Sequence, residues 1–500
     1  MDCTNEKDLQ LFYLSSLFGA VNESCRKMNN VTYSSGDSQG KRRVLSPLQA
    51  FLCKIAQVCD TEKGGNTITA LVALKTDNGP EYLFASNSRK EAELEITRKF
   101  LADLLEFVGR NPVGLAEKAL KKQVLWRILE FNFPRVDFYL KQIVASVGEC
   151  IAIDMELTAE GSKVVARLRM IEASATFPRD MQSDTGARSK FLSDCETLIK
   201  AIQDTVATGF SVVMDKGATA DDPETSYAWC QLRHHLGRLY SYRQTADGIV
   251  EACKEWPELF ANFTARFIPS SRSARLWLPR PTLSLEDVIP AAFPDKNVQT
   301  YTSHIEQLRE YGLGDDIRER LERKLVKQSV HCEVHLQDFL VREKMIESRN
   351  YWNNEMFIAT SKPPCRLCHY YFDDSDNDFL VQSPHMNVYP KWRLPDVQRG
   401  QDKDAVVRRE ELLDEIIERM QEDTLNIVRE QRHQWKRNDS RTGSWVGESR
   451  LGERSDTRAS GRCPSASGTG GQSMGAEGRG FDFQLPTAIE NDYVSVGSAS

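Results

Sequence analysis

The sequence predicts an α/β fold in which a short sheet is joined to a large, mainly helical region. Two apolar, β-favouring runs at 67–74 and 81–87 flank an Asp-Asn-Gly segment, a pattern typical of a β-hairpin, and an apolar run at 356–360 predicts a further strand. From about 90 to 330 apolar residues recur mostly at helical spacing, with a Pro-rich loop at 269–281.

Further helices flank these segments. Ser46 followed by Pro47 is typical of a helix start, and the apolar residues after them predict a helix over 46–60. A second apolar pattern predicts a long helix over 403–435. After this helix Gly, Ser, Arg, Asp and Thr dominate, and such a segment buries too little apolar surface to offset its ordering entropy. We therefore expect a disordered tail at 436–500.

The overall composition narrows the class of protein. The 500 residues carry a formal net charge of -7 and a mean hydropathy of -0.48. This net charge gives no support for sequence-independent binding to duplex nucleic acid. The longest uncharged run near the N-terminus, 9–22, is too short to span a bilayer, and the acidic residues before it disfavour a secretory signal. Twelve scattered cysteines with one close pair predict reduced thiols, and hence an intracellular protein, cytoplasmic or nuclear.

Two short motifs carry the functional signal, His-Cys-Glu at 331–333 and Pro-Cys-Arg-Leu-Cys at 364–368. His331, Cys365 and Cys368 offer one imidazole and two thiolates. Helical spacing places both cysteines on one face of an opening helical turn, where the helix dipole favours the thiolate form. Three protein ligands leave one tetrahedral position of Zn²⁺ open for water, which is typical of a catalytic site.

Other interpretations of the cysteine pair are open. A fourth ligand from His335 or His369 would make a structural zinc site. The pair could also be a redox motif or two buried thiols. Glu333 favours catalysis, because a purely structural zinc site has no need of that carboxylate.

The order H-x-E followed by P-C-x-x-C resembles the zinc-dependent nucleobase deaminases of the cytidine deaminase-like superfamily. More narrowly, the chain is similar to a predicted nucleic acid or nucleotide deaminase family first noted in Orientia and abundant in fungi. That narrower similarity also rests on Ser-Lys-Pro-Pro-Cys at 361–365 and on Tyr-Pro-Lys-Trp-Arg-Leu-Pro at 389–395.

The resemblance implies roles for individual residues. Zn²⁺ would be bound by His331, Cys365 and Cys368, while Glu333 would take a proton from water and deliver it to the ring nitrogen and the departing amine. Asn87 is a candidate substrate-binding residue, although a turn residue that ends a strand is an equally good interpretation. The substrate would be a nucleobase in a nucleotide or in single-stranded nucleic acid. The alternatives are a deaminase of something else, such as a small aminated metabolite or a peptide amide, and an inactive protein that keeps zinc for structure and serves as an interaction module.

The same resemblance implies a three-layer α-β-α deaminase core with a mixed sheet that opens with a helix and a hairpin. The residues before His331 have helical periodicity instead, so we predict a discontinuous core interrupted by a large all-helical insertion. Strand 68–74 should then pair antiparallel beside 356–360, with 379–382 on the other side. The predicted parts are an N-terminal helical segment (1–45), the first part of the core (46–88), the insertion (89–325), the zinc-binding core (326–435) and the tail (436–500).

Overall fold

The computed structural model describes residues 6–29 and 43–434. Gaps within this range lie at 154–158, 180, 182–183, 208, 221, 280–282, 323–324, 376–377 and 398–402. The predicted disordered tail at 436–500 lies outside the described residues. No helix among the described residues is both long and apolar enough to cross a membrane.

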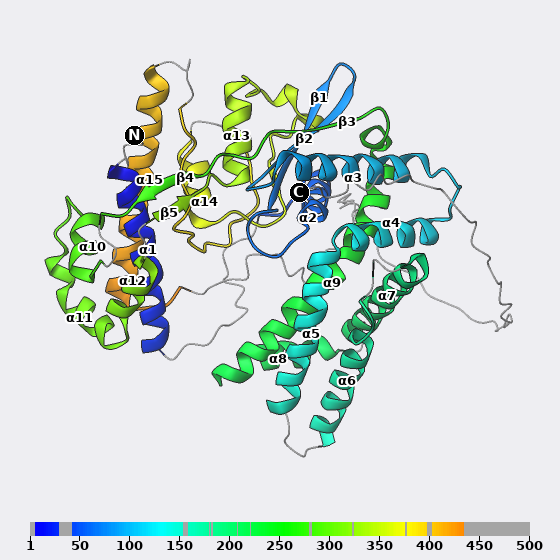
Figure 1. The fold of residues 1–500 in the computed structure, drawn as a ribbon, viewed down its shortest axis with the longest axis horizontal. Helices are drawn as coiled ribbons and strands as arrows, with labels where there is room; N and C mark the ends of the chain where they lie inside the picture. The colour runs from blue at the N-terminus through cyan, green and yellow to red at the C-terminus, as the bar shows by residue number, and fades with distance from the viewer. Residues whose placement is uncertain are drawn as a thin grey trace, which may run out of the picture. The chain divides into compact units, whose positions relative to one another are not determined.

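A four-stranded mixed sheet organises the fold, in the order β3-β2-β1-β6. Figure 1 labels the first three of these strands. The predicted hairpin is confirmed: β1 (Thr69–Thr76) and β2 (Gly79–Ser86) pair antiparallel. Gly79 makes the turn possible, because its φ of +117° is one that side-chain-bearing residues rarely adopt. A Cβ at this position would also lie 2.6 Å from the carbonyl oxygen of Asn262.

The predicted long-range pairing is also confirmed. Strand β6 (Ala359–Thr360) pairs antiparallel with β1, with Ala70 opposite Thr360. On the other side of this segment, Phe357 forms a parallel bridge with Leu380. The first hairpin thus shares a sheet with the segment that leads into the cysteine motif, while the predicted domain boundaries stay a prediction.

The region 89–325 is not all helical, and that expectation is wrong. Strand β3 (Thr264–Phe267) pairs parallel with β2, and β4 (Ala274–Trp277), where we predicted a loop, pairs antiparallel with β5 (Leu325–Gln328). These strands have only 4 residues each, too few to show a clear period of two. The strands with which β3 and β4 pair lie far away in the chain, so local sequence does not reveal these pairings.

Helices cover both faces of the sheet, because its side chains alternate between two apolar clusters. Leu71 and Phe84 pack in one cluster with α2 (Pro47–Cys59). Val72 and Leu83 pack in the other with α13 (Cys332–Arg342). As predicted, α2 starts at Ser46, whose hydroxyl accepts a hydrogen bond from the backbone N–H of Gln49.

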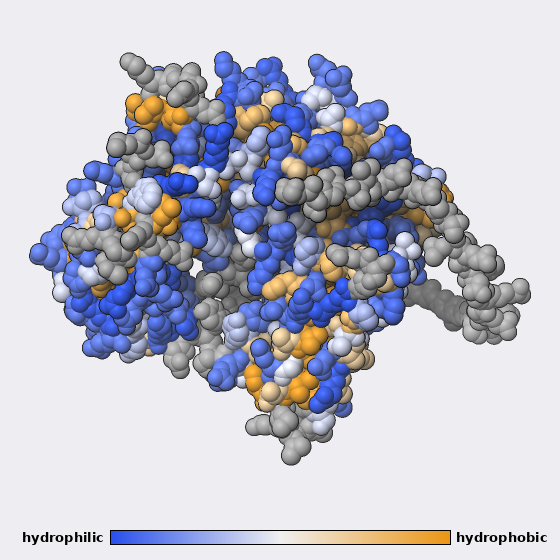
Figure 2. All heavy atoms as spheres, in the orientation of Figure 1, coloured by the Kyte–Doolittle hydropathy of each residue, from blue (hydrophilic) through white to orange (hydrophobic). Residues whose placement is uncertain are grey.

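Most other elements pack on one of these two clusters. Figure 1 shows the helices of the first cluster lying together, and Figure 2 shows apolar side chains gathered on their visible surface. These helices are α3 (Glu91–Arg110), α4 (Glu117–Phe131), α5 (Phe133–Ile153), α6 (Ala159–Ala175), α7 (Thr185–Ala207), α8 (Phe210–Ala218) and α9 (Pro223–Glu255). The second cluster is formed with α1 (Glu6–Met28), α10 (Leu285–Ala292), α11 (Thr302–Glu310), α12 (Leu313–Leu321), α14 (Arg366–Asp374) and α15 (Lys403–Glu430). The expected small mixed sheet therefore exists within a mostly helical chain, and its assignment to a three-layer deaminase core stays a prediction.

Candidate metal centre

The structure brings His331, Cys365 and Cys368 together, and among the described residues they form the only cluster of three His, Cys, Asp or Glu side chains suited to hold a metal. Nδ1 of His331 lies 3.6 Å from Sγ of Cys365 and 3.3 Å from Sγ of Cys368. The two sulfur atoms are 3.5 Å apart. A tetrahedral zinc with bonds of about 2.3 Å to sulfur and about 2.0–2.1 Å to nitrogen requires ligand separations of about 3.6–3.8 Å. The three donors therefore fit zinc with small adjustments.

Two helix starts position the donors. His331 is the N-cap residue of α13, and Cys365 is the N-cap residue of α14, with Cys368 in the first turn. Both helices thus direct their positive ends towards the cluster, which favours thiolates there. The predicted placement of the two motifs at helix starts is confirmed.

The two thiols differ in their ionisation. Burial by itself raises the pKa of Cys365, but the hydrogen bond with Cys368 and the neighbouring His331 imidazole outweigh it and bring this pKa well below its usual value. For Cys368, burial and the charge on Cys365 raise the pKa well above its usual value. Cys365 therefore ionises more readily than Cys368, and a bound cation would favour the second thiolate.

Two further side chains support the cluster from outside. The indole N–H of Trp392, which is fully buried, donates to Sγ of Cys368 at 3.2 Å. The backbone N–H of Cys332 donates to Oδ1 of Asn87 at 2.7 Å, so Asn87 holds the first turn of α13 in place. Its amide group donates to the carbonyl of Gly65 at 2.8 Å. The order of these residues in the chain did not reveal either contact.

Glu333 lies beside the cluster. Its Oε1 is 4.0 Å from Nδ1 of His331, and its Oε2 accepts a hydrogen bond from the thiol of Cys332 at 3.4 Å. The side chain is buried, yet it lines a pocket together with the metal-cluster residues His331 and Cys365. The remaining lining residues are Ile68, Asn87, Lys362, Pro363, His385 and Tyr389. Sequence reasoning singled out Asn87 but missed His385, which stands outside both motifs.

The two other histidines near the motifs do not complete a four-ligand site. Nε2 of His335 is 2.9 Å from the carbonyl oxygen of Pro269. Nδ1 of His369 is 3.3 Å from a carboxylate oxygen of Asp373. Neither belongs to the cluster, so the described residues offer three ligands.

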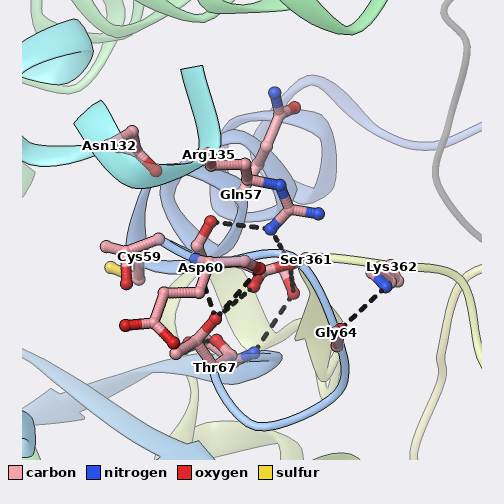
Figure 3. Close-up of polar contacts among 12 residues, drawn as sticks. Gln57, Cys59, Asp60, Gly64, Thr67, Asn132, Arg135, Ser361 and Lys362 are labelled. Carbon is pink, nitrogen blue, oxygen red and sulfur yellow. Dashed lines mark hydrogen bonds and ion pairs between the residues drawn. The ribbon is translucent and has the colours of Figure 1, made fainter. Parts of the chain in front are cut away.

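A second buried polar group supports the loop that leads to Cys365 (Figure 3). Asp60, directly after α2, forms an ion pair of 2.5 Å with Arg135 of α5, and both side chains are buried. The hydroxyl groups of Thr67 and Ser361 donate to the Asp60 carboxylate at 2.7 and 3.3 Å. Burial alone would raise the pKa of Asp60, but the nearby charges of Arg135 and Lys362 lower it overall.

Sequence reasoning missed this pair. The available signal was Arg135 in the first turn of a helix, where the dipole disfavours a cation unless an acidic group compensates. The ion pair connects the helical region with Ser361, which lies in the loop before the metal cysteines.

Residues 330–396 match the family model of the OTT_1508-like deaminases. This segment contains His331, Glu333, Cys365 and Cys368, so the resemblance inferred from the two motifs is confirmed over this part of the chain. No curated protein and no solved structure matches the chain. The match supports deaminase chemistry, and it does not extend to the hairpin or to the helical region.

Proposed function

We propose that this chain is a zinc-dependent aminohydrolase that converts an amino-substituted nucleobase to its keto form and releases ammonia. The observation that carries the proposal is the three-donor cluster with Glu333 beside it at the pocket. The deaminase match over residues 330–396 supports the same chemistry.

The donor set suits a resident catalytic metal. His331, Cys365 and Cys368 would hold the ion and leave a tetrahedral position for water. When bound, zinc lowers the pKa of that water towards about 7, which supplies a nucleophile near neutral pH.

Glu333 would carry the protons of the reaction. Its carboxylate takes a proton from the attacking water and transfers it to the ring nitrogen next to the carbon under attack. A second proton from the same water then reaches the departing amino group through Glu333, so that one water and one amine give one carbonyl and one ammonia. Burial of Glu333 at the pocket beside the cluster supports this role, because a carboxylate with little contact to bulk water would exchange protons with a bound substrate.

The pocket lining suggests how a base would be held. Tyr389 offers an aromatic ring 6.0 Å from that of His331, suited to stacking on a base. Asn87 also lines the pocket, which supports its proposed role in substrate binding, and its hydrogen bond to Cys332 gives it a positioning role as well.

The decisive experiment measures ammonia and the product base. Purified protein would be incubated with cytosine- and adenine-containing nucleosides, nucleotides and short single-stranded oligonucleotides. Glu333→Gln should lower turnover by about 10²–10⁴-fold or more while bound zinc stays at the wild-type level. Glu343→Gln, at the exposed end of the same helix, is the matched control and should leave turnover unchanged.

Two outcomes would contradict the proposal. Loss of zinc from Glu333→Gln would identify Glu333 as a ligand. Zinc binding without turnover of any substrate in the panel would favour the alternative, an inactive protein with structural zinc that acts as an interaction module.

A further inference from the structure

The ribbon formed by β4 and β5 carries an exposed basic face close in sequence to the metal motif. We call it the β4–β5 basic face and define it by Arg275, Trp277 and Lys327 of the two strands and by Arg272 just before β4, all of which are exposed. The segments 270–279 and 325–331 contain no aspartate or glutamate, although the whole chain has a net charge of -7. The face is therefore a local concentration of positive charge on an acidic protein.

The register of the ribbon places two of these cations directly opposite each other. Arg275 pairs with Lys327 across the antiparallel strands. Like charges at such positions destabilise a sheet. Among the described residues, no ion pair or hydrogen bond neutralises the side chains of Arg272, Arg275 or Lys327. Folding alone gives no reason for this arrangement, whereas an anionic ligand bound across the ribbon would stabilise it.

Trp277 adds an aromatic surface to the same face. Its neighbours Leu276 and Leu278 are buried in the second apolar cluster, while 51% of Trp277 is exposed. The indole lies two residues from Arg275 on the same strand, so both side chains point to the same side of the ribbon. Cations that follow a phosphate backbone, together with an exposed aromatic ring on which a base can stack, are typical of surfaces that bind single-stranded nucleic acid.

The ribbon leads towards the pocket. Strand β5 ends at Gln328, and the backbone N–H of the next residue, Ser329, donates to the carbonyl of Lys391 at 2.8 Å. Lys391 is exposed and lies two residues from the pocket residue Tyr389. At about 3.3 Å per extended residue, the path from Leu325 to His331 is roughly 20 Å long, enough for a few nucleotides.

We propose that the β4–β5 basic face binds single-stranded nucleic acid and guides one of its bases to the pocket at His331. This inference names the substrate class of the proposed deaminase and rests on that function for the guidance step, while binding to the face can be measured separately. Phosphates would contact Arg272, Arg275 and Lys327, and a base upstream or downstream of the target would stack on Trp277.

The experiment measures binding of the full-length protein to a fluorescein-labelled single-stranded oligonucleotide of mixed sequence, as RNA and as DNA, by anisotropy at several salt concentrations. The double variant Arg275→Gln/Lys327→Gln should weaken binding by at least about tenfold. It should also lower the slope of log affinity against log salt, since each phosphate contact contributes about 0.7 for single strands. Trp277→Ala should weaken binding by about 5–150-fold, as expected for loss of one stacked base.

Matched controls carry the same changes elsewhere. Lys99→Gln/Lys118→Gln removes two exposed cations from α3 and α4, and Tyr227→Ala removes an exposed ring from α9. Thermal unfolding should show that all variants are folded at the assay temperature, and Arg275→Gln/Lys327→Gln should unfold at or slightly above the wild-type temperature, because it removes two opposed like charges.

The outcomes separate this proposal from the proposed function. Equal affinity of the Arg275→Gln/Lys327→Gln variant and its control would overturn the inference. So would binding that Trp277→Ala leaves unchanged, because the face would then recognise an anion without bases, such as an acidic protein. Turnover of free nucleosides with no oligonucleotide binding would overturn the inference and leave the deaminase proposal intact. Oligonucleotide binding through this face without deamination would support the surface and contradict the deaminase proposal.

Discussion

Two buried polar clusters are joined by the loop 361–365, and they differ in how their charges are satisfied. The Asp60 carboxylate has an ion pair with Arg135 and hydrogen bonds from Thr67 and Ser361, so protein groups complete its surroundings. The cluster at Cys365 gathers three electron-pair donors with no cation from the described residues among them. Buried charge requires a partner. The first cluster has this partner within the chain, whereas the second, under the proposed function, would take it from solution as a metal ion.

The largest effect should follow from removing a metal donor. Cys368→Ser should reduce bound zinc from about one ion per chain to an undetectable level, abolish turnover and lower the unfolding temperature, since metal binding contributes directly to folding. Elemental analysis and thermal unfolding measure both effects. Cys253→Ser, on a partly exposed cysteine of α9, is the control and should keep its zinc. Retention of zinc by Cys368→Ser would contradict the proposal that the cluster at Cys365 binds the metal, and with it the comparison with the Asp60 cluster.

The next largest effect should come from breaking the buried ion pair between Asp60 and Arg135. Arg135→Met leaves the Asp60 carboxylate without its counter-charge in a buried site, which should lower the free energy of unfolding by about 3–5 kcal/mol in urea denaturation. Arg110→Met breaks the exposed pair with Glu106 and should cost no more than about 1 kcal/mol. Adding Asp60→Asn to Arg135→Met should recover part of the loss, and a double variant less stable than Arg135→Met would contradict this account.

A smaller effect should result from removing the hydrogen bond that Trp392 donates to the proposed metal ligand Cys368. Trp392→Phe keeps an aromatic ring in the core but removes the hydrogen bond to Sγ of Cys368. Loss of such outer contacts typically weakens metal affinity by about 10–100-fold, which competition with a zinc chelator would measure. Trp352→Phe, next to Tyr351 and away from the cluster, should leave zinc affinity unchanged. An unchanged affinity in Trp392→Phe would mean that this hydrogen bond only anchors the indole.

The smallest effect concerns pH. The pKa of Asp60 is lower in the folded protein than its unfolded value of about 3.9, so the folded state binds this proton less readily than the unfolded state. The stability that the ionised carboxylate contributes is therefore fully present above about pH 5. It is lost as the pH falls through the folded pKa, by at most about 1.4 kcal/mol for each pH unit.

The comparison of wild type with Asp60→Asn isolates this contribution. Their difference in unfolding free energy should stay constant from about pH 7 to pH 5 and narrow below about pH 4. A difference that grows on acidification would reverse the sign of the shift and contradict the assigned ion pair.

Much of the candidate site could be predicted from local sequence. The residues of the metal cluster stand in two short motifs, and their placement at two helix starts follows from capping and spacing rules that act within one turn. The hairpin was equally accessible, because Asp-Asn-Gly between two β-favouring runs defines its turn. Its pairing with the strand before the cysteines needed the family resemblance, because nothing in residues 67–87 indicates a partner almost 300 positions away.

Other parts could not be predicted because their signals are not local. Arg135 and Asp60 are an ordinary arginine and an ordinary aspartate until the fold buries them together. Strand β3 forms by pairing with the edge of β2. The exposed Trp277 becomes part of a candidate binding surface only through the register that sets Arg275 opposite Lys327.

The sequence by itself determined which side chains can bind a metal, where their helices begin and which runs form the hairpin, since each depends on contacts within a few residues. Only the tertiary structure decided that three donors converge within 3.6 Å of one another, that Asn87 and Trp392 hold them from outside, and that Arg135 supports the loop before Cys365. The physical reason is that burial and long-range pairing change the energy of a charge or a hydrogen bond far more than its sequence neighbours do.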